Sequence, residues 1–189
     1  MINGSNIHEW PSNYRKVLHY FFSFPEQAIS LNNLARNTKI SKTSAKSAVI
    51  YLFKENFLKK EVVGNAWRLF ADQKSPLFVT KKIPYNLELV YGSGIIAQVY
   101  KKIPEARTIV LFGSYRWGTD TEESDIDIGV EILGNREMQI ENLMLLKNIG
   151  LRKDIKVNLH IFTRNKINLN LFTNIANGIV LDGLIEVHP

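Results

Sequence analysis

Apolar side chains recur with a helical period through the first 55 residues of the chain. Between residues 14 and 24 they fall at i, i+1, i+4 and i+5, which predicts an amphipathic helix ending before Pro25. Ser30 and Ser41 each precede a further apolar pattern, and serine is a favoured helix N-cap. The pattern predicts a short helix over residues 31–37 and a longer third helix that begins after Ser41.

Two β-prone runs follow these helices, at residues 57–63 and 66–70, and Gly64-Asn65 separates them. Such a pair of runs joined by a two-residue turn predicts a β-hairpin. Three helices and a hairpin, with a short turn between the second and third helices, resemble a winged helix-turn-helix over residues 10–72. The resemblance implies a module that binds double-stranded DNA, with contact to another protein as the alternative.

Residues 73–104 are predicted to be a linker and helical segment between two domains. Pro76 and Pro84 favour a linker over residues 72–86, and a helical pattern follows up to residue 102. The string from Gly92 to Ala97 has the letters of a dinucleotide-binding fingerprint. Because that fingerprint requires a buried strand before it, and the preceding residues are amphipathic, we predict a helix–loop–helix joint instead.

Short β-branched and alternating runs dominate the rest of the chain, residues 105–189. A strand is predicted over 107–112, a second over 125–132, a helix over about 135–151, and a third strand over 155–162. These elements predict a mixed sheet with flanking helices. The whole chain is therefore expected to be α+β, with an N-terminal winged helix-turn-helix and a C-terminal sheet domain.

Positive charge is confined to the first module. Residues 1–75 hold 11 Lys and Arg against 5 Asp and Glu, whereas the remainder holds 13 of each. Such segregation indicates a polyanion such as nucleic acid, with a lysine-rich solvated surface as the alternative. Small polar and basic residues at the start of the third helix and in the hairpin are the predicted DNA contacts. They are Lys42, Thr43, Ser44, Lys46, Ser47, Asn65 and Arg68.

Several classes of protein are disfavoured by composition. The chain has no cysteine, so a disulfide framework, a thiolate metal site and a cysteine nucleophile are all excluded. No uncharged stretch reaches the roughly 20 apolar residues that a membrane span needs. The first residues lack the basic start and apolar run of a signal peptide. We therefore predict a cytoplasmic protein with no membrane partner.

Two carboxylates mark the second domain as the part that carries chemistry. In a strand over 125–132, Asp125 and Asp127 share one face, about 7 Å apart, while isoleucines occupy the other face. Such a pair is unfavourable unless a cation binds it, and a hard divalent cation prefers oxygen ligands. Gly113 and Ser114, at the end of the preceding strand, offer backbone N–H groups and a hydroxyl to a phosphate.

The ordered string Phe112-Gly113-Ser114, Gly118, Ser124-Asp125-Ile126-Asp127 resembles the nucleotidyltransferase superfamily related to DNA polymerase β. It is similar to the small prokaryotic members, the minimal nucleotidyltransferases, over about residues 105–185. The resemblance implies that Asp125 and Asp127 hold Mg²⁺ or Mn²⁺ on ATP or another nucleoside triphosphate. It also implies that Gly113 and Ser114 contact the terminal phosphates, and that a nucleoside monophosphate, AMP first, is transferred to a hydroxyl acceptor.

Asn158 departs from the superfamily pattern, which places a third catalytic carboxylate on the later strand. An amide oxygen ligates a metal but does not accept a proton near neutral pH. His160, two residues along the same face, is the nearby general-base candidate, with an ordinary strand residue as the alternative. Two functions stay open: a transferase acting on a small molecule or protein, and a DNA-binding transcriptional regulator whose degenerate domain senses nucleotide. A homodimer also stays open.

Overall fold

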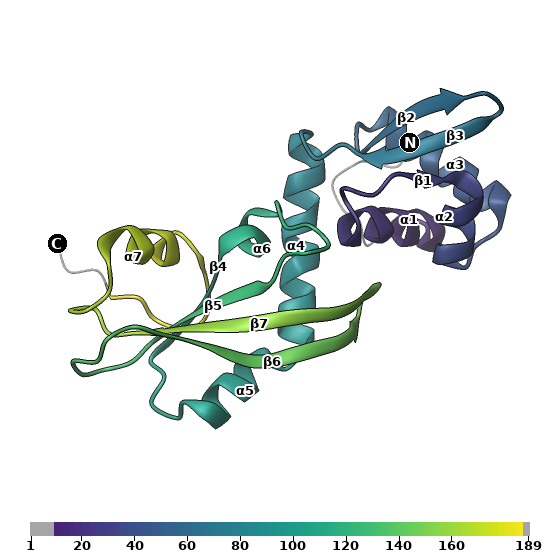
Figure 1. Ribbon diagram of the computed structural model, residues 1–189. Helices are drawn as coiled ribbons and strands as arrows, with labels where there is room; N and C mark the ends of the chain where they lie inside the picture. The colour runs from purple at the N-terminus through teal and green to yellow at the C-terminus, as the bar shows by residue number, and fades with distance from the viewer. Residues whose placement is uncertain (1–9, 187–189) are drawn as a thin grey trace. The chain divides into compact units, whose positions relative to one another are not determined.

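The computed structural model describes residues 10–186, and the chain divides into two units, Met1–Lys82 and Ile83–Pro189. In Figure 1 the first unit is coloured purple to blue and the second teal to yellow. The boundary falls inside the segment 73–104 that the sequence predicts as a linker and helical segment. The last three residues of the predicted domain 105–189 lie outside the described residues.

Three helices and a three-stranded antiparallel sheet, ordered β1-β3-β2, precede the boundary helix in the described part of the first unit. Ser30 Oγ accepts a hydrogen bond from Asn33 N–H (3.3 Å) and Ser41 Oγ accepts one from Ser44 N–H (3.1 Å), so both predicted N-caps are confirmed. The winged helix-turn-helix stays a prediction. The elements are α1 (Ser12–Ser23), β1 (Ile29–Ser30), α2 (Leu31–Thr38), α3 (Lys42–Lys54), β2 (Leu58–Val63) and β3 (Ala66–Ala71).

The apolar stripes predicted for the first unit form its core. Side chains from all three helices and from β3 are fully buried there, which is the main source of stability for short helices. They include Val17, Leu18, Phe21, Leu34, Val49, Leu52 and Leu69.

The predicted linker over residues 72–86 contains the boundary between the two units. The expectation that its prolines keep it out of a helix is wrong, because the structure has a helix from Pro76 to Gly92, α4. Pro76 stands at the first helical position, where a missing N–H removes no hydrogen bond. Pro84 lies inside the helix and removes one bond, but burial of Phe78 and Val90 favours the helix on either side. The predicted joint after it is confirmed: Gly94, at φ 77°, precedes α5 (Ile95–Lys102).

A five-stranded mixed sheet ordered β6-β7-β5-β4-β8 forms the second unit, with β5 and β7 parallel and the other pairs antiparallel. The α+β class and the mixed sheet with flanking helices are confirmed for the described residues. Beyond α5, the elements are β4 (Thr108–Phe112), α6 (Gly113–Trp117), β5 (Ile126–Glu131), β6 (Gln139–Ile149), β7 (Arg152–Phe162), α7 (Leu169–Ala176) and β8 (Ile179–Gly183).

The helix predicted over residues 135–151 is also wrong, because β6 occupies most of that segment and pairs with β7 along its length. The register shifts between Asn142 and Met144, so a bulge interrupts the two-residue alternation that identifies a strand. The run from Leu143 to Leu146 also consists of good helix formers. Pairing with a central strand overrides that local preference.

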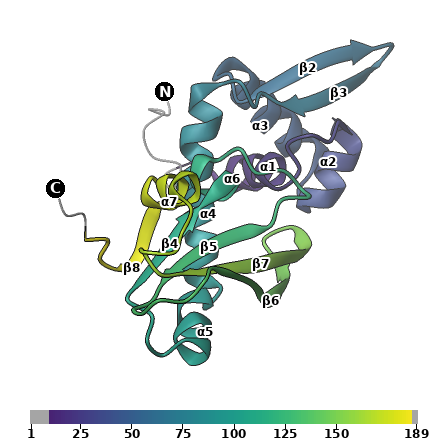
Figure 2. The same cartoon turned by 60° about the vertical axis from the view of Figure 1, so that its left-hand side comes forward.

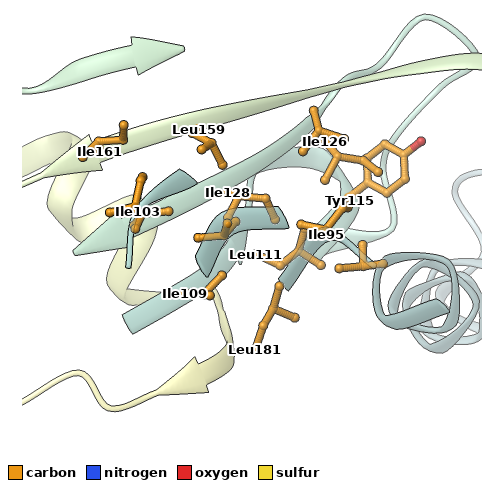
Figure 3. Packing of buried hydrophobic residues seen from close by; sticks show 14 of the residues in the cluster. Ile95, Ile103, Ile109, Leu111, Tyr115, Ile126, Ile128, Leu159, Ile161 and Leu181 are labelled. Atoms are coloured by element: carbon orange, nitrogen blue, oxygen red, sulfur yellow. The ribbon is translucent and has the colours of Figure 1, made fainter. Parts of the chain in front are cut away.

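Helices cover both faces of the second sheet. On one face, α4 and α5 pack against β4, β5 and β7 in the larger core cluster, which Figure 3 shows from close by around Leu111, Ile128 and Leu159. On the other face, Ile175 of α7 packs with Val110 and Phe112. Figures 1 and 2 show α5 and α7 on opposite sides of the sheet. Because alternate strand residues point to opposite faces, β4 supplies both clusters.

Candidate functional site

The structure brings Asp127 and Asn158 into register on the face of the sheet that α7 covers. Asp127 is paired with Phe112 of β4 on one side and with Asn158 of β7 on the other. Residues opposite one another in a sheet point to the same face. The alternate residues Ile126 and Ile128 are fully buried on the other face, as the alternation predicts.

Asp125 lies just before β5 and contacts Asn158 through its side chain. Asn158 Nδ2 donates a hydrogen bond to Asp125 Oδ2 at 3.2 Å. The amide therefore acts as a hydrogen-bond donor to the first carboxylate and adds no negative charge beside it. At this position the superfamily pattern has an acid, whereas this chain has a hydrogen-bond donor to Asp125.

His160 is turned toward Asp127. Its Nε2 lies 3.1 Å from Asp127 Oδ1, and an ionised carboxylate only accepts, so Nε2–H is the donor. Nδ1 is buried and has no partner among the described residues, and the ring meets Phe112 edge-on at 4.8 Å between centroids. With Nε2 occupied and Nδ1 shielded, this histidine presents no free lone pair to a substrate. It is placed to hold the carboxylate.

Gly113 allows the loop after β4 to approach Asp127 closely. Its φ is 71°, a conformation that favours glycine, and a Cβ built on it would lie 2.9 Å from Asp127 Oδ2. Ser114 follows at the start of α6, and its hydroxyl has no hydrogen-bond partner within the described part of the chain. The turn and the second carboxylate are therefore adjacent, as the sequence pattern predicts.

A buried polar network that the sequence does not reveal supports this loop. The Arg152 guanidinium donates to Tyr115 Oη and to the carbonyl of Ser124 (2.9 Å), which ties β7 to both ends of the loop. Asn86 of α4 donates to the Tyr115 carbonyl (3.0 Å) and to Asp120 Oδ1 (2.6 Å). Burial raises the pKa of the Tyr115 phenol well above its usual range, so the hydroxyl stays protonated and neutral.

Replacing Arg152 by methionine should destabilise the protein by about 1–3 kcal/mol, because the buried Tyr115 hydroxyl is left without its partner. The double variant Arg152→Met with Tyr115→Phe should be less destabilised than the sum of the two single variants, since no unpaired hydroxyl remains. Urea unfolding of all four proteins measures this coupling. Additive effects would contradict the role given to the pair.

Asp125, Asp127, Asn158 and His160, together with the turn at Gly113 and Ser114, are called the acidic face here. This face fits a magnesium ion that arrives with a nucleotide. Asp125 Oδ1 and Asp127 Oδ2 make no hydrogen bond to any described residue, so each acid keeps one free oxygen. Mg²⁺ is usually held by one or two carboxylates together with substrate phosphates. Over residues 10–186 there is no group of three His, Cys, Asp or Glu side chains that would hold a metal without such a ligand.

The predicted DNA contacts in the first unit lie in three different places. Lys42, Lys46 and Asn65 line one cavity. Thr43 and Ser47 are exposed on α3, whereas Ser44 Oγ is bonded to Ser41 Oγ (2.9 Å) in the cap of that helix. Arg68 is not brought to the cavity: it lies on the outer face of the hairpin, where it pairs with Glu61 at 3.8 Å.

The mixed sheet and the paired carboxylates of the second unit are consistent with a nucleotidyltransferase-like domain. Residues 95–182 match the family model described as Polymerase beta, Nucleotidyltransferase, and this match supports the nucleotidyltransferase superfamily. The matched residues include Gly113, Ser114, Asp125, Asp127 and Asn158 and lie wholly in the second unit. The match suggests nucleotidyl transfer in general, which is the activity of a transferase.

No curated protein matches the chain. Among the helices of the described residues, none has the length and apolar character that crossing a membrane requires.

Proposed function

We propose that the second unit binds a magnesium-complexed nucleoside triphosphate, ATP first, and transfers its nucleoside monophosphate to a hydroxyl group. The acceptor oxygen forms a bond to the α-phosphorus and its proton passes to water. The bond from that phosphorus to the bridging oxygen breaks, and pyrophosphate leaves. The observation that supports this proposal is the pair Asp125 and Asp127, each with one free oxygen, beside the loop at Gly113.

Each residue of the acidic face has a separate role in this proposal. Asp125 and Asp127 hold Mg²⁺ or Mn²⁺, which when bound neutralises phosphate charge and polarises the phosphoryl group. The Gly113 N–H and the Ser114 hydroxyl receive the terminal phosphates. His160 keeps Asp127 oriented through the 3.1 Å contact, and Asn158 keeps Asp125 oriented through the 3.2 Å contact. None of these residues supplies a free base for the attacking hydroxyl, so we expect slow transfer.

Incubation of the whole protein with ATP labelled at the α-phosphate tests the proposal. With Mg²⁺ or Mn²⁺ present, we expect pyrophosphate release and label transferred to the protein itself or to an added hydroxyl compound. Each of the other nucleoside triphosphates serves as a competitor that reveals the preferred base. Tight nucleotide binding without label transfer under any of these conditions would contradict the enzymatic proposal.

A second candidate function is a DNA-binding regulator whose second unit senses nucleotide without turning it over. Two observations favour it. The missing third acid leaves Asn158 as a donor to Asp125. In the first unit, Lys42 and Lys46 at the start of α3 form no ion pair with any described residue. Double-stranded DNA is the partner that this charge suits.

For this candidate, we expect the whole protein to bind duplex DNA with an affinity that falls steeply as salt rises. Lys42→Ala with Lys46→Ala should weaken binding and lower the slope of log K against log salt by about 2, because each lysine neutralises one phosphate. Lys54→Ala, which removes one charge from the last turn of the same helix, is the control. Salt-insensitive binding by all three proteins would favour protein contact instead.

A further inference from the structure

A cavity of about 260 Å³ opens on the first unit where three elements meet. The start of α2, the start of α3 and the turn of the hairpin between β2 and β3 supply its walls. We call it the Trp67 pocket. Its lining residues are Ser30, Leu31, Asn32, Lys42, Lys46, Asn65, Ala66 and Trp67.

The Trp67 pocket is positively charged and contains no acid. Lys42 and Lys46 line it, and neither forms an ion pair with a residue that the structure describes. On the outer face of the hairpin the situation is the opposite, because Lys59 pairs with Asp72 at 2.7 Å and Arg68 pairs with Glu61 at 3.8 Å. The lysines without an acidic partner therefore lie at the pocket, whereas the basic residues on the outer face of the hairpin are paired with acids.

The Trp67 ring contacts the ammonium groups of two lysines. Lys46 Nζ lies 5.6 Å from the centroid of the indole and Lys60 Nζ lies 4.5 Å from it. Lys60 Nζ also lies 5.1 Å from the Phe53 ring, so it sits between two aromatic side chains. Cation–π contacts hold both ammonium groups at the indole ring, and of the two lysines only Lys46 lines the cavity.

The inner face of β3 carries the aromatic side of the pocket. Leu69, two residues from Trp67 and on the same face, is fully buried against the helices, whereas Arg68 and Phe70 point to the outer face. Trp67 itself is only partly buried, so part of its ring is open to a ligand. The indole offers an apolar surface directly beside two cationic groups.

We propose that the Trp67 pocket binds one sugar–phosphate unit of duplex DNA, with the phosphate on Lys42, Lys46 and the Asn65 amide and the deoxyribose against the Trp67 ring. This inference rests on the proposed DNA binding of the first unit and adds the residues that position the duplex. Backbone contacts of this kind fix register without reading sequence.

The whole protein with labelled duplexes tests the pocket. Trp67→Ala and Lys46→Gln should each weaken binding by about fivefold or more, and equally for duplexes of unrelated sequence. Trp67→Phe keeps a ring and should bind nearly as the natural protein does. Phe70→Ala, on the same strand but the opposite face, is the matched control and should change the affinity by less than about twofold. Thermal unfolding of each variant confirms that the first unit is folded.

Tryptophan fluorescence gives a second measurement that needs no destabilising variant. Duplex DNA should quench the emission of the natural protein, and Trp67→Phe should lose that quenching while still binding the labelled duplex. If Trp67→Ala binds the duplex normally and the natural protein shows no quenching, the proposed role of the pocket is overturned, while DNA binding by the first unit still stands. Absence of any duplex binding overturns both. Equal quenching by inorganic phosphate or free ATP would show that the pocket binds a small anion, and would overturn the proposal that it binds duplex DNA.

Discussion

Replacing Asp125 and Asp127 together by asparagine should abolish both label transfer and the magnesium-dependent part of ATP binding. In the natural protein, Mg²⁺-ATP at one hundred times its Kd should stabilise the fold by about 2.7 kcal/mol. For a unit of this size each kcal/mol raises Tm by about 4 °C, so the expected shift is about 10 °C. Amide oxygens carry no charge to replace the two carboxylates, so the variant should show only the smaller shift that ATP gives without a divalent ion.

Asp154→Asn is the matched control for this experiment, because Asp154 lies on the exposed part of β7 and makes no ion pair with a described residue. It should behave as the natural protein does. The double variant should itself fold normally, since removing two neighbouring like charges relieves repulsion in the free protein. An unchanged magnesium-dependent shift in the double variant would place the nucleotide elsewhere.

Asn158→Asp should raise any transfer activity by about 10²–10⁴, the range that a positioned general base contributes. The new carboxylate replaces an amide whose Nδ2 lies 3.2 Å from Asp125 Oδ2, so in the metal-free protein a hydrogen bond becomes a repulsion. We therefore expect the variant to be less stable than the natural protein without metal. It should bind Mg²⁺ more tightly, because the ion then relieves that repulsion.

Two further variants separate this explanation from the alternative in which His160 supplies the base. Asn158→Ala removes the amide without adding charge, and should not raise activity. His160→Ala should weaken metal binding, by about 10–100-fold for a residue that orients a ligand, and leave the pH dependence of transfer unchanged. Fast transfer by the natural protein that requires His160 and gains nothing from Asn158→Asp would contradict our interpretation of Asn158.

Part of the acidic face could be predicted from the sequence. Asp125, Asp127, Gly113 and Ser114 are near one another in the sequence, and their spacing across two strands predicts that the turn meets the carboxylates. The alternation along β7 likewise predicts that Asn158 and His160 share a face. The hydrogen bonds from Asn158 to Asp125 and from His160 to Asp127 depend on the parallel pairing of β5 with β7. No periodicity within one strand specifies which strand lies beside it.

Local chemistry accounts for what the sequence by itself determined. The caps at Ser30 and Ser41, the hairpin turn at Gly64, and the alternation around Ile126 and Ile128 all depend on residues within one element. Hydrogen bonds to a neighbouring N–H and side-chain periodicity act over three or four residues, so they are visible in the chain. The confinement of the excess positive charge to residues 1–75 is visible in the same way.

Only the tertiary structure decided the features in which long-range burial or pairing outweighs local preference. Residues 139–149 form a strand because β7 pairs with them, although their leucines favour a helix. Residues 76–92 form a helix through Pro84 because the apolar residues on either side of it are buried. Arg152 meets Tyr115, and Lys46 meets Trp67, although the two members of each pair are far apart in the sequence. These contacts form only in the folded chain, between residues far apart in the sequence. Local sequence patterns therefore do not predict them.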